Sequence, residues 1–240
     1  MSRPVPKSLP LSEPRDQRDT KERILDAGEA LFMEHGFEAT SLRQITAAAE
    51  VNLAAVNYHF GSKEELFQAV LTRRLDPMNT ERVSLLEQYE RETIGQMPSC
   101  ERILNAMFIP ALRLARDNQR GGKNFLRLLG RAYADPAPFI RHFLSEQYAP
   151  MIARFKSAFS RALPHLPKKE LVWRLHFLMG AMSYTLAGTD ALKLIAELNP
   201  TESGNDELLL KRLAPFLVAG LQAPLPDLLE TRGEAERAKA

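Results

Sequence analysis

Apolar residues recur at helical spacing along most of this sequence. Near the N-terminus, for example, Ile24, Leu25, Leu31 and Phe32 fall on one face of a helix. No segment shows a convincing alternation of apolar and polar residues with a period of two, which a half-buried strand requires. The pattern therefore predicts an all-α fold.

The helices divide into two predicted domains. Four short helices over residues 18–74 form a small N-terminal domain, and the fourth ends near Arg74, before Pro77. A larger helical domain over residues 75–223 has helices near 79–94, 99–118, 121–134, 137–163, 168–190 and 205–221. Pro110 and Pro215 interrupt apolar periodic runs and predict kinks or breaks. We expect a disordered arm over residues 1–17 and a polar, frayed tail over residues 224–240.

Residues 40–66 carry the most informative pattern. Thr40 is suited to cap one short helix, and Asn52 is suited to cap a second after a turn near Glu50. Gly61 ends the second helix, and Ser62 begins the next with Glu65 as its capping-box partner. Two short helices at this spacing make a helix-turn-helix, whose second helix fits the DNA major groove.

The same stretch resembles the DNA-binding domain of TetR/AcrR-type transcriptional regulators over about residues 20–70. The matching positions are Gly36-Phe37, Thr40-Ser41, Ile45, Val51, Tyr58-His59-Phe60, Ser62-Lys63-Glu64 and Leu66. Thr46 and Glu50 depart from the pattern, which usually has Ala and Gly there. A left-handed backbone at Glu50 costs about 1 kcal/mol or more relative to Gly. The segment from Val51 to Leu66 is also similar to fatty-acid-responsive members, which points to a lipid-like ligand.

The recognition helix supplies most of the predicted DNA contacts. Its outward side carries Leu53, Ala54, Asn57 and Tyr58, while Val56 turns inward. Asn57 suits a bidentate contact to adenine, and Ala54 suits a thymine methyl group. The resemblance assigns phosphate contacts to Thr40, Tyr58 and Lys63. The full predicted DNA-binding set is Thr40, Ser41, Arg43, Leu53, Ala54, Asn57, Tyr58, His59 and Lys63. For Asn57 and Arg43 a solvated surface role is the alternative, and for His59 a structural role is favoured.

Charge adds no support for DNA binding. The whole chain has a formal charge of +2, and residues 15–74 hold eight basic and ten acidic residues, a net charge of −2. Phosphate contacts need local rather than net charge. Basic groups of the N-terminal arm, Arg43 and Lys63 are therefore expected to share one face.

The resemblance implies two further surfaces in the C-terminal domain. The last two helices are apolar on most faces and are expected to pair with those of a second copy, because a helix-turn-helix dimer binds palindromic half-sites about 34–36 Å apart. The predicted dimer residues are Leu175, Met179, Met182, Leu213, Phe216, Leu217 and Gly220. A small, hydrophobic or fatty-acyl-like effector is expected to bind among Phe108, Phe125, Leu129, Tyr133, Phe143, Met151, Phe155, Trp173 and Phe177. A plain monomer core is the alternative for both sets.

Composition excludes several other classes of protein. Motifs of metalloproteases, serine hydrolases and phosphate-binding loops are absent, and the five His residues have no metal-ligand spacing, so we expect neither an enzyme nor a cofactor. The single cysteine, Cys100, rules out an intrachain disulfide. With no apolar segment typical of a signal peptide or membrane span, we expect a cytoplasmic protein.

The sequence as a whole predicts a ligand-released dimeric repressor, and the alternative is a helical protein-binding adaptor.

Overall fold

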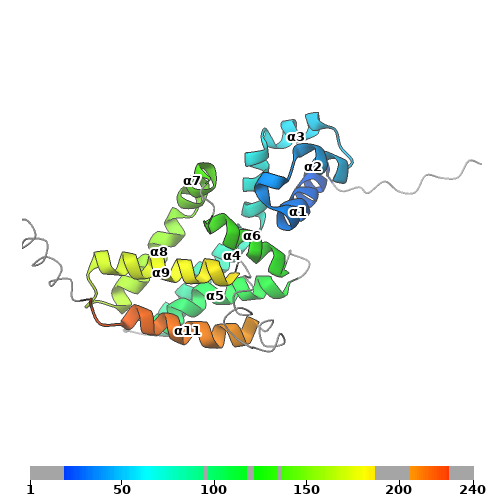
Figure 1. Cartoon of the computed structure of the whole chain (residues 1–240). Helices are drawn as coiled ribbons and strands as arrows, with labels where there is room; N and C mark the ends of the chain where they lie inside the picture. The colour runs from blue at the N-terminus through cyan, green and yellow to red at the C-terminus, as the bar shows by residue number, and fades with distance from the viewer. Residues whose placement is uncertain (1–18, 94–96, 118–121, 135–136, 187–205, 227–240) are drawn as a thin grey trace, which may run out of the picture. The chain divides into compact units, whose positions relative to one another are not determined.

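All secondary structure in the described part of the chain is helical. The computed structural model describes residues 19–93, 97–117, 122–134, 137–186 and 206–226, and these ranges contain no strand. The predicted all-α fold is therefore confirmed (Figure 1). The arm expected over residues 1–17 and most of the tail after residue 224 lie outside the described residues.

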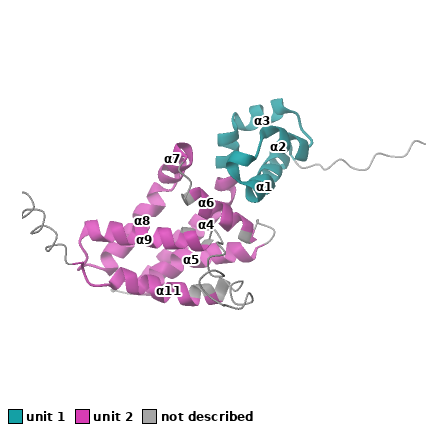
Figure 2. Ribbon diagram, in the orientation of Figure 1, with its two compact units in different colours: residues 1–69 teal, residues 70–240 magenta. Residues whose placement is uncertain are grey.

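The chain divides into two compact units, residues 1–69 (unit 1) and residues 70–240 (unit 2) (Figure 2). Unit 1 contains α1 (Thr20–Ala39), α2 (Leu42–Ala48), α3 (Leu53–Phe60) and the first turns of α4 (Lys63–Glu92). Its core includes a cluster of rings in which Phe67 meets Phe32 and Phe37 edge-on, with centroids 5.0 and 5.1 Å apart. Such edge-to-face pairs add to the stability gained by burying the rings.

Unit 2 consists of longer helices packed around one apolar core. After α4 come α5 (Cys100–Arg116), α6 (Gly122–Ala134), α7 (Pro138–Gln147), α8 (Ala149–Ala162), α9 (Lys168–Leu186) and α11 (Asp206–Gln222). Both α6 and α11 pack on α5 and α9 (Figure 1). Leu86, Ile103, Phe155 and Phe159 are among the buried side chains of the core. No helix among the described residues combines the length and the apolar character that a membrane span needs.

Three prolines lie inside helices that run on without a break. The prediction of one helix ending near Arg74 and another starting near residue 79 is wrong, because α4 is continuous through Pro77. Proline removes one backbone hydrogen bond, but buried Leu75 and Met78 hold α4 on both sides of it. Pro110 in α5 and Pro215 in α11 are likewise accommodated within helices.

The single helix predicted over residues 137–163 is also wrong, because two helices meet at Tyr148. This residue has φ −109° and ψ 9°, and Pro150 follows in the first turn of α8. Proline fits the first turn of a helix, where no N–H partner is needed, and it disfavours continuation from the preceding helix. Tyr148 is buried at this junction, and its hydroxyl donates to Asp76 Oδ1 at 3.1 Å.

Candidate functional site

The start of α2 is set by Ser41 rather than by Thr40. Ser41 Oγ accepts a hydrogen bond from the Gln44 backbone N–H at 3.3 Å, and the Gln44 side chain accepts one from the Ser41 N–H at 2.8 Å. These reciprocal bonds form a capping box. The predicted cap by Thr40 is wrong: this residue is 1% exposed, and its hydroxyl donates to the carbonyls of Gly36 at 2.8 Å and Leu31 at 3.2 Å. Thr40 therefore fixes the end of α1, and Ser41 is the exposed hydroxyl at the start of α2.

A tight turn sets α3 against α2. Glu50 has φ 53°, the only positive φ of a non-glycine residue in the described chain, which confirms the left-handed backbone expected there. The Val51 N–H then donates to the Thr46 carbonyl at 3.0 Å. Asn52 caps α3, as predicted, because its Oδ1 accepts from the Ala55 N–H at 2.9 Å.

The two sides of α3 differ sharply in exposure. Val56 and Phe60 are buried in the core of unit 1. Leu53, Ala54, Asn57 and Tyr58 are exposed together, and Tyr58 reaches 85% exposure. The partly buried His59 lies edge-on to the Tyr58 ring with centroids 5.1 Å apart. The structure therefore brings four of the predicted DNA-binding side chains onto one open face of a short helix.

The end of α3 requires a glycine. Gly61 has φ 75°, a left-handed backbone that residues with a side chain rarely adopt. Ser62 then begins α4, because its Oγ accepts from the Glu65 N–H at 3.1 Å. The next residue, Lys63, places Nζ 4.2 Å from the centroid of the Phe37 ring and 3.5 Å from the Glu38 carbonyl oxygen. The Lys63 ammonium is therefore held at the end of α1, whereas Arg43 is exposed on α2.

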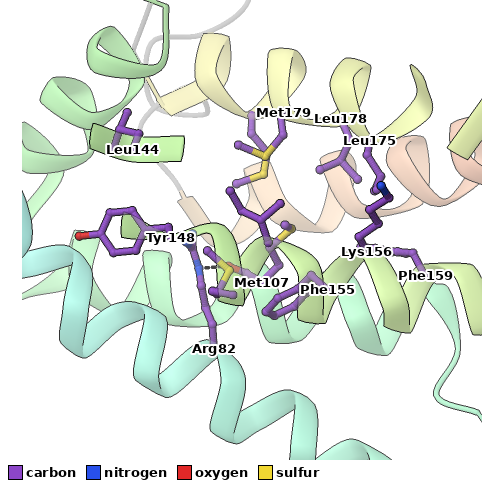
Figure 3. Close-up of a pocket in the computed structure, with 13 residues that line it drawn as sticks. Arg82, Met107, Leu144, Tyr148, Phe155, Lys156, Phe159, Leu175, Leu178 and Met179 are labelled. Atoms are coloured by element: carbon purple, nitrogen blue, oxygen red, sulfur yellow. Dashed lines mark hydrogen bonds between the residues drawn. The ribbon is translucent and has the colours of Figure 1, made fainter. Parts of the chain in front are cut away.

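Unit 2 contains a partly open apolar cavity of about 130 Å³ between α4, α5, α7, α8 and α9. Figure 3 shows side chains from several helices converging on it. The cavity is lined by Arg82, Met107, Leu144, Tyr148, Met151, Ile152, Phe155, Lys156, Phe159, Leu175, Leu178, Met179 and Met182.

A buried arginine lies in the wall of this cavity. Arg82 is 4% exposed, its Nε donates to the Met107 carbonyl at 2.8 Å, and its Nη1 donates to Asn79 Oδ1 at 2.9 Å. Sequence reasoning missed Arg82. A signal was available, because Arg82 lies seven residues after Leu75 and four before Leu86, so it falls on the buried face of α4.

The predicted effector residues separate into three groups. Met151 and Phe155 line the cavity. Phe108, Phe125 and Leu129 are core residues outside its lining, Phe143 is partly buried against Tyr148, and the Tyr133 side chain lies outside the described residues. Trp173 and Phe177 are not in the cavity wall, because they lie on the outward side of α9 and are 58% and 64% exposed.

Most of the predicted dimer residues point inward, and only two of them are exposed. Leu175, Met179 and Met182 face the cavity, Leu217 is buried, and Leu213 is partly buried against the core. Phe216, at 68% exposure, and Gly220 are the members that lie open on α11. We call the exposed apolar side of α9 and α11 the outward face; it comprises Val172, Trp173, Phe177, Gly180, Tyr184, Phe216 and Gly220.

Arg174 ties the two helices of the outward face together. It is buried, and its guanidinium donates to the carbonyls of Leu221, Ala223 and Pro224 at 2.7–3.0 Å. Its Nε also donates to Glu170 Oε1 at 2.8 Å. The bonds to Leu221, Ala223 and Pro224 satisfy carbonyls at and just after the end of α11, where the helix supplies no partner. Arg174 thus fixes the position of α9 relative to α11, the two helices that carry the outward face.

Comparison with known proteins gives a consistent match over both units. The family description "Bacterial regulatory proteins, tetR family" matches residues 24–70, and "Tetracyclin repressor-like, C-terminal domain" matches residues 105–220. The uncharacterized helix-turn-helix transcriptional regulator TtgW of Pseudomonas putida is 38% identical over 63 residues, which are 26% of this chain and 47% of TtgW. The regulator SrpR of Pseudomonas putida is also 38% identical over 63 residues, 26% of this chain and 30% of SrpR. The chain thus spans less than half the length of these relatives.

Solved structures extend the similarity of fold to most of the chain. The fatty acid degradation regulator FadR of Bacillus halodurans has a TM-score of 0.57 and 14% identity, covering 87% of this chain and 99% of FadR. AmtR of Mycobacterium smegmatis has a TM-score of 0.53 and 17% identity, covering 94% of this chain and 97% of AmtR. At these identities the likeness concerns the fold alone.

Proposed function

We propose, because this chain belongs to the TetR family of bacterial regulatory proteins, that it is a repressor that binds a palindromic operator as a dimer and is released by a small effector. The observation that carries the proposal is the open face of α3, where Leu53, Asn57 and Tyr58 project from a helix whose other side is buried. A short helix exposed in this way after a tight turn fits the major groove.

The predicted contacts need one revision in this proposal. Asn57 and Tyr58 remain at the centre of the DNA-binding surface, with Leu53 and Ala54 beside them. Ser41 replaces Thr40 as the hydroxyl at the start of α2, because the Thr40 hydroxyl donates to carbonyls of α1. Arg43 and Lys63 supply positive charge, and Lys63 must leave or share its position over Phe37 to meet a phosphate.

A mobility-shift assay on DNA upstream of the protein's own coding sequence tests the DNA contacts. Asn57→Ala or Tyr58→Ala should weaken binding by about 1–3 kcal/mol, or 5- to 150-fold, as expected for a lost base or backbone contact. Glu34→Gln, an exposed change on α1, is the matched control and should bind as the wild type does. Unchanged binding in both α3 variants rejects the surface. If the wild type shows no salt-sensitive, sequence-specific binding, an adaptor that binds protein is favoured instead.

Dimerisation through the outward face is the second part of the proposal. Phe177 and Phe216 are exposed rings on two helices that Arg174 holds together, and burial of such rings is a large source of association energy. Regulators of this family usually act as dimers. A second copy is therefore the proposed occupant of this face.

Sedimentation velocity tests this assignment. Phe216→Asp should shift the protein toward the monomer, because each dimer would bury two uncompensated carboxylates. Lys169→Glu, an exposed change at the start of α9, should leave the dimer intact. A dimer that persists unchanged in Phe216→Asp places the contact elsewhere.

The effector acts, in this proposal, by selecting one of two arrangements. A ligand in the cavity of unit 2 that prefers a second arrangement changes the spacing of the two α3 helices and releases the operator. It can do so only through its different affinities for the two states, typically a 5- to 150-fold effect. A saturating cavity ligand that leaves operator affinity unchanged contradicts the release step and leaves DNA recognition standing.

A further inference from the structure

Helix α3 lacks the charged side chains that most often distinguish G·C base pairs. None of its eight residues is Arg, Lys, Asp or Glu, and its single basic residue, His59, is partly buried beside the Tyr58 ring. In the major groove, guanine is most often contacted by Arg or Lys, and the cytosine amino group donates to Asp or Glu. The exposed face of α3 is therefore poorly suited to select a G·C pair.

The Asn57 amide is available for two hydrogen bonds with a base. The side chain is exposed, and its amide forms no hydrogen bond with any described residue. The Asn57 backbone is fixed, because its carbonyl accepts from the Gly61 N–H at 2.9 Å. An asparagine amide both donates and accepts, which matches the N7 acceptor and the N6 donor that adenine presents in the major groove. Asn57 therefore has the chemistry of an adenine contact.

Leu53 and Ala54 form an apolar patch one turn before Asn57. Both are exposed, and they precede Asn57 by four and three residues, so the three side chains share one side of the helix. Apolar side chains in the major groove pack on the C5 methyl group of thymine. This spacing covers about 4.5–6 Å of helix, which is less than two steps of about 3.4 Å along the duplex. A thymine methyl on the patch is therefore expected within two base pairs of the adenine.

The basic residues on the helices next to α3 are placed away from this set. Lys63 belongs to α4, and its ammonium lies 4.2 Å from the centroid of the Phe37 ring at the end of α1. Arg43 belongs to α2, and in a helix-turn-helix the first helix crosses the DNA backbone while the second lies in the groove. A guanine contacted by Arg43 is therefore independent of Asn57, which variants of Asn57 can show.

We infer that α3 selects A·T base pairs, with Asn57 bonded to N6 and N7 of an adenine and the patch of Leu53 and Ala54 packed on a thymine methyl group within two base pairs of it. Each half-site of the operator accordingly has an A·T core. This inference rests on the proposed DNA-binding function and adds the class of base that the recognition helix selects. It also gives Asn57 a role in base recognition in place of the solvated surface role that the sequence leaves open.

Selection of bound duplexes from a random pool by the full-length protein tests the inference without knowledge of the operator. The wild type should enrich half-sites that hold an adenine and a thymine within two base pairs. Asn57→Ala should accept all four bases at that adenine position and keep the other preferences. Gln88→Ala removes an exposed amide on α4 and, as the matched control, should select the wild-type sequence. G·C pairs at the positions that change in Asn57→Ala, or an adenine that persists in this variant, overturn the inference.

Base analogues in the selected duplex then identify the contacted atoms. 7-Deazaadenine lacks the N7 acceptor and should weaken wild-type binding at least about fivefold at one adenine, because the Asn57 amide loses a hydrogen bond. The same analogue should change the binding of Asn57→Ala by less than about twofold, because the contact is already absent. Since the two duplexes are compared on the same variant, a change in its folding cancels. Equal penalties in the wild type and in Asn57→Ala overturn the assignment to Asn57.

Uracil in place of thymine tests the apolar patch. It removes the C5 methyl group alone and should weaken wild-type binding about fourfold at a position within two base pairs of the adenine, as expected for one methyl group removed from water. In Leu53→Ala or Ala54→Gly this penalty should fall below about twofold, because the partner of the methyl group is reduced. The absence of any uracil penalty in the wild type, or a full penalty in both variants, overturns the contact to the patch.

The same measurements separate this inference from the proposed function. If the wild type enriches a specific sequence but the analogue penalties are absent or do not depend on α3, the DNA-binding function stands and the A·T selection fails. If the wild type enriches no sequence from the pool, the DNA-binding function fails and the inference fails with it.

Discussion

The two units of this protein control their helices in different ways. In unit 1, single side chains set where helices begin: Ser41, Asn52 and Ser62 each accept a backbone N–H at a helix start. In unit 2, Ser99 caps α5 in the same way, but α7 and α8 meet at Tyr148 without a side-chain cap. The helix starts of unit 1 are therefore specified by local chemistry that a motif can reveal, whereas the junction of α7 and α8 in unit 2 depends on which side of each helix turns inward.

Helix α9 shows why that second question is harder. Leu175, Leu178 and Met179 face the cavity, while Trp173 and Phe177 of the same helix are exposed. A helix with apolar residues on every side gives no periodic signal for its inward face. Only the packing of α9 against α6, α8 and α11 distinguishes the cavity wall from the outward face.

The largest expected effect separates the two sides of α9. Leu178→Ala removes buried methyl groups from the core and should lower the free energy of unfolding by 2–5 kcal/mol. Phe177→Ala, one residue away and exposed, should cost less than about 0.5 kcal/mol in the monomer. Urea unfolding followed by circular dichroism, at concentrations low enough to keep the protein monomeric, measures both. Similar losses in the two variants would mean that α9 is turned differently.

A smaller effect tests the importance of caps in unit 1. Asn52→Ala removes the acceptor for the Ala55 N–H and should lower the stability of unit 1 by about 1 kcal/mol. Asn57→Ala, on the exposed side of the same helix, is the matched change and should leave stability within about 0.5 kcal/mol of the wild type. Thermal unfolding of the two variants provides the measurement. If Asn52→Ala is as stable as Asn57→Ala, the cap does not stabilise α3 and the importance given to caps in unit 1 is contradicted.

The smallest effect, and the only stabilising one, is expected at the turn before α3. Glu50 holds a left-handed backbone, so Glu50→Gly should raise the free energy of unfolding by about 0.5–1 kcal/mol. Glu64→Gly, within helix α4, should lower it by about 1 kcal/mol, because glycine is a poor helix former. If glycine raises the free energy of unfolding at position 50 and lowers it at position 64, the backbone conformation of each residue is the cause. A loss of stability in both variants contradicts that explanation.

The sequence sufficed for the fold class, the helix-turn-helix and the exposed side of α3. These features depend on turn residues and caps whose preferences are local, as Asn52, Gly61 and Ser62 illustrate. The sequence predicts Thr40 instead of Ser41 as the cap of α2, because Thr and Ser have similar capping preferences. The bonds of the Thr40 hydroxyl to the Leu31 and Gly36 carbonyls show that Thr40 is the buried one.

The continuity of α4 and the cavity depended on tertiary contacts. Pro77 is an ordinary signal for the end of a helix, but buried neighbours on both sides override it. Arg82 lies in a charged stretch and attracts attention only when the buried face of α4 is known. Lys156 and Met107 likewise become cavity residues through the packing of α8 against α5 and α9.

The placement of Trp173 has an optical consequence. It is the only tryptophan of the chain, it lies on the outward face, and its ring stacks on Phe177 with centroids 5.9 Å apart. Indole emission shifts to shorter wavelength when water is removed from around the ring. The native protein therefore carries a single indole, outside the cavity lining, whose emission wavelength reports whether the exposed side of α9 is covered.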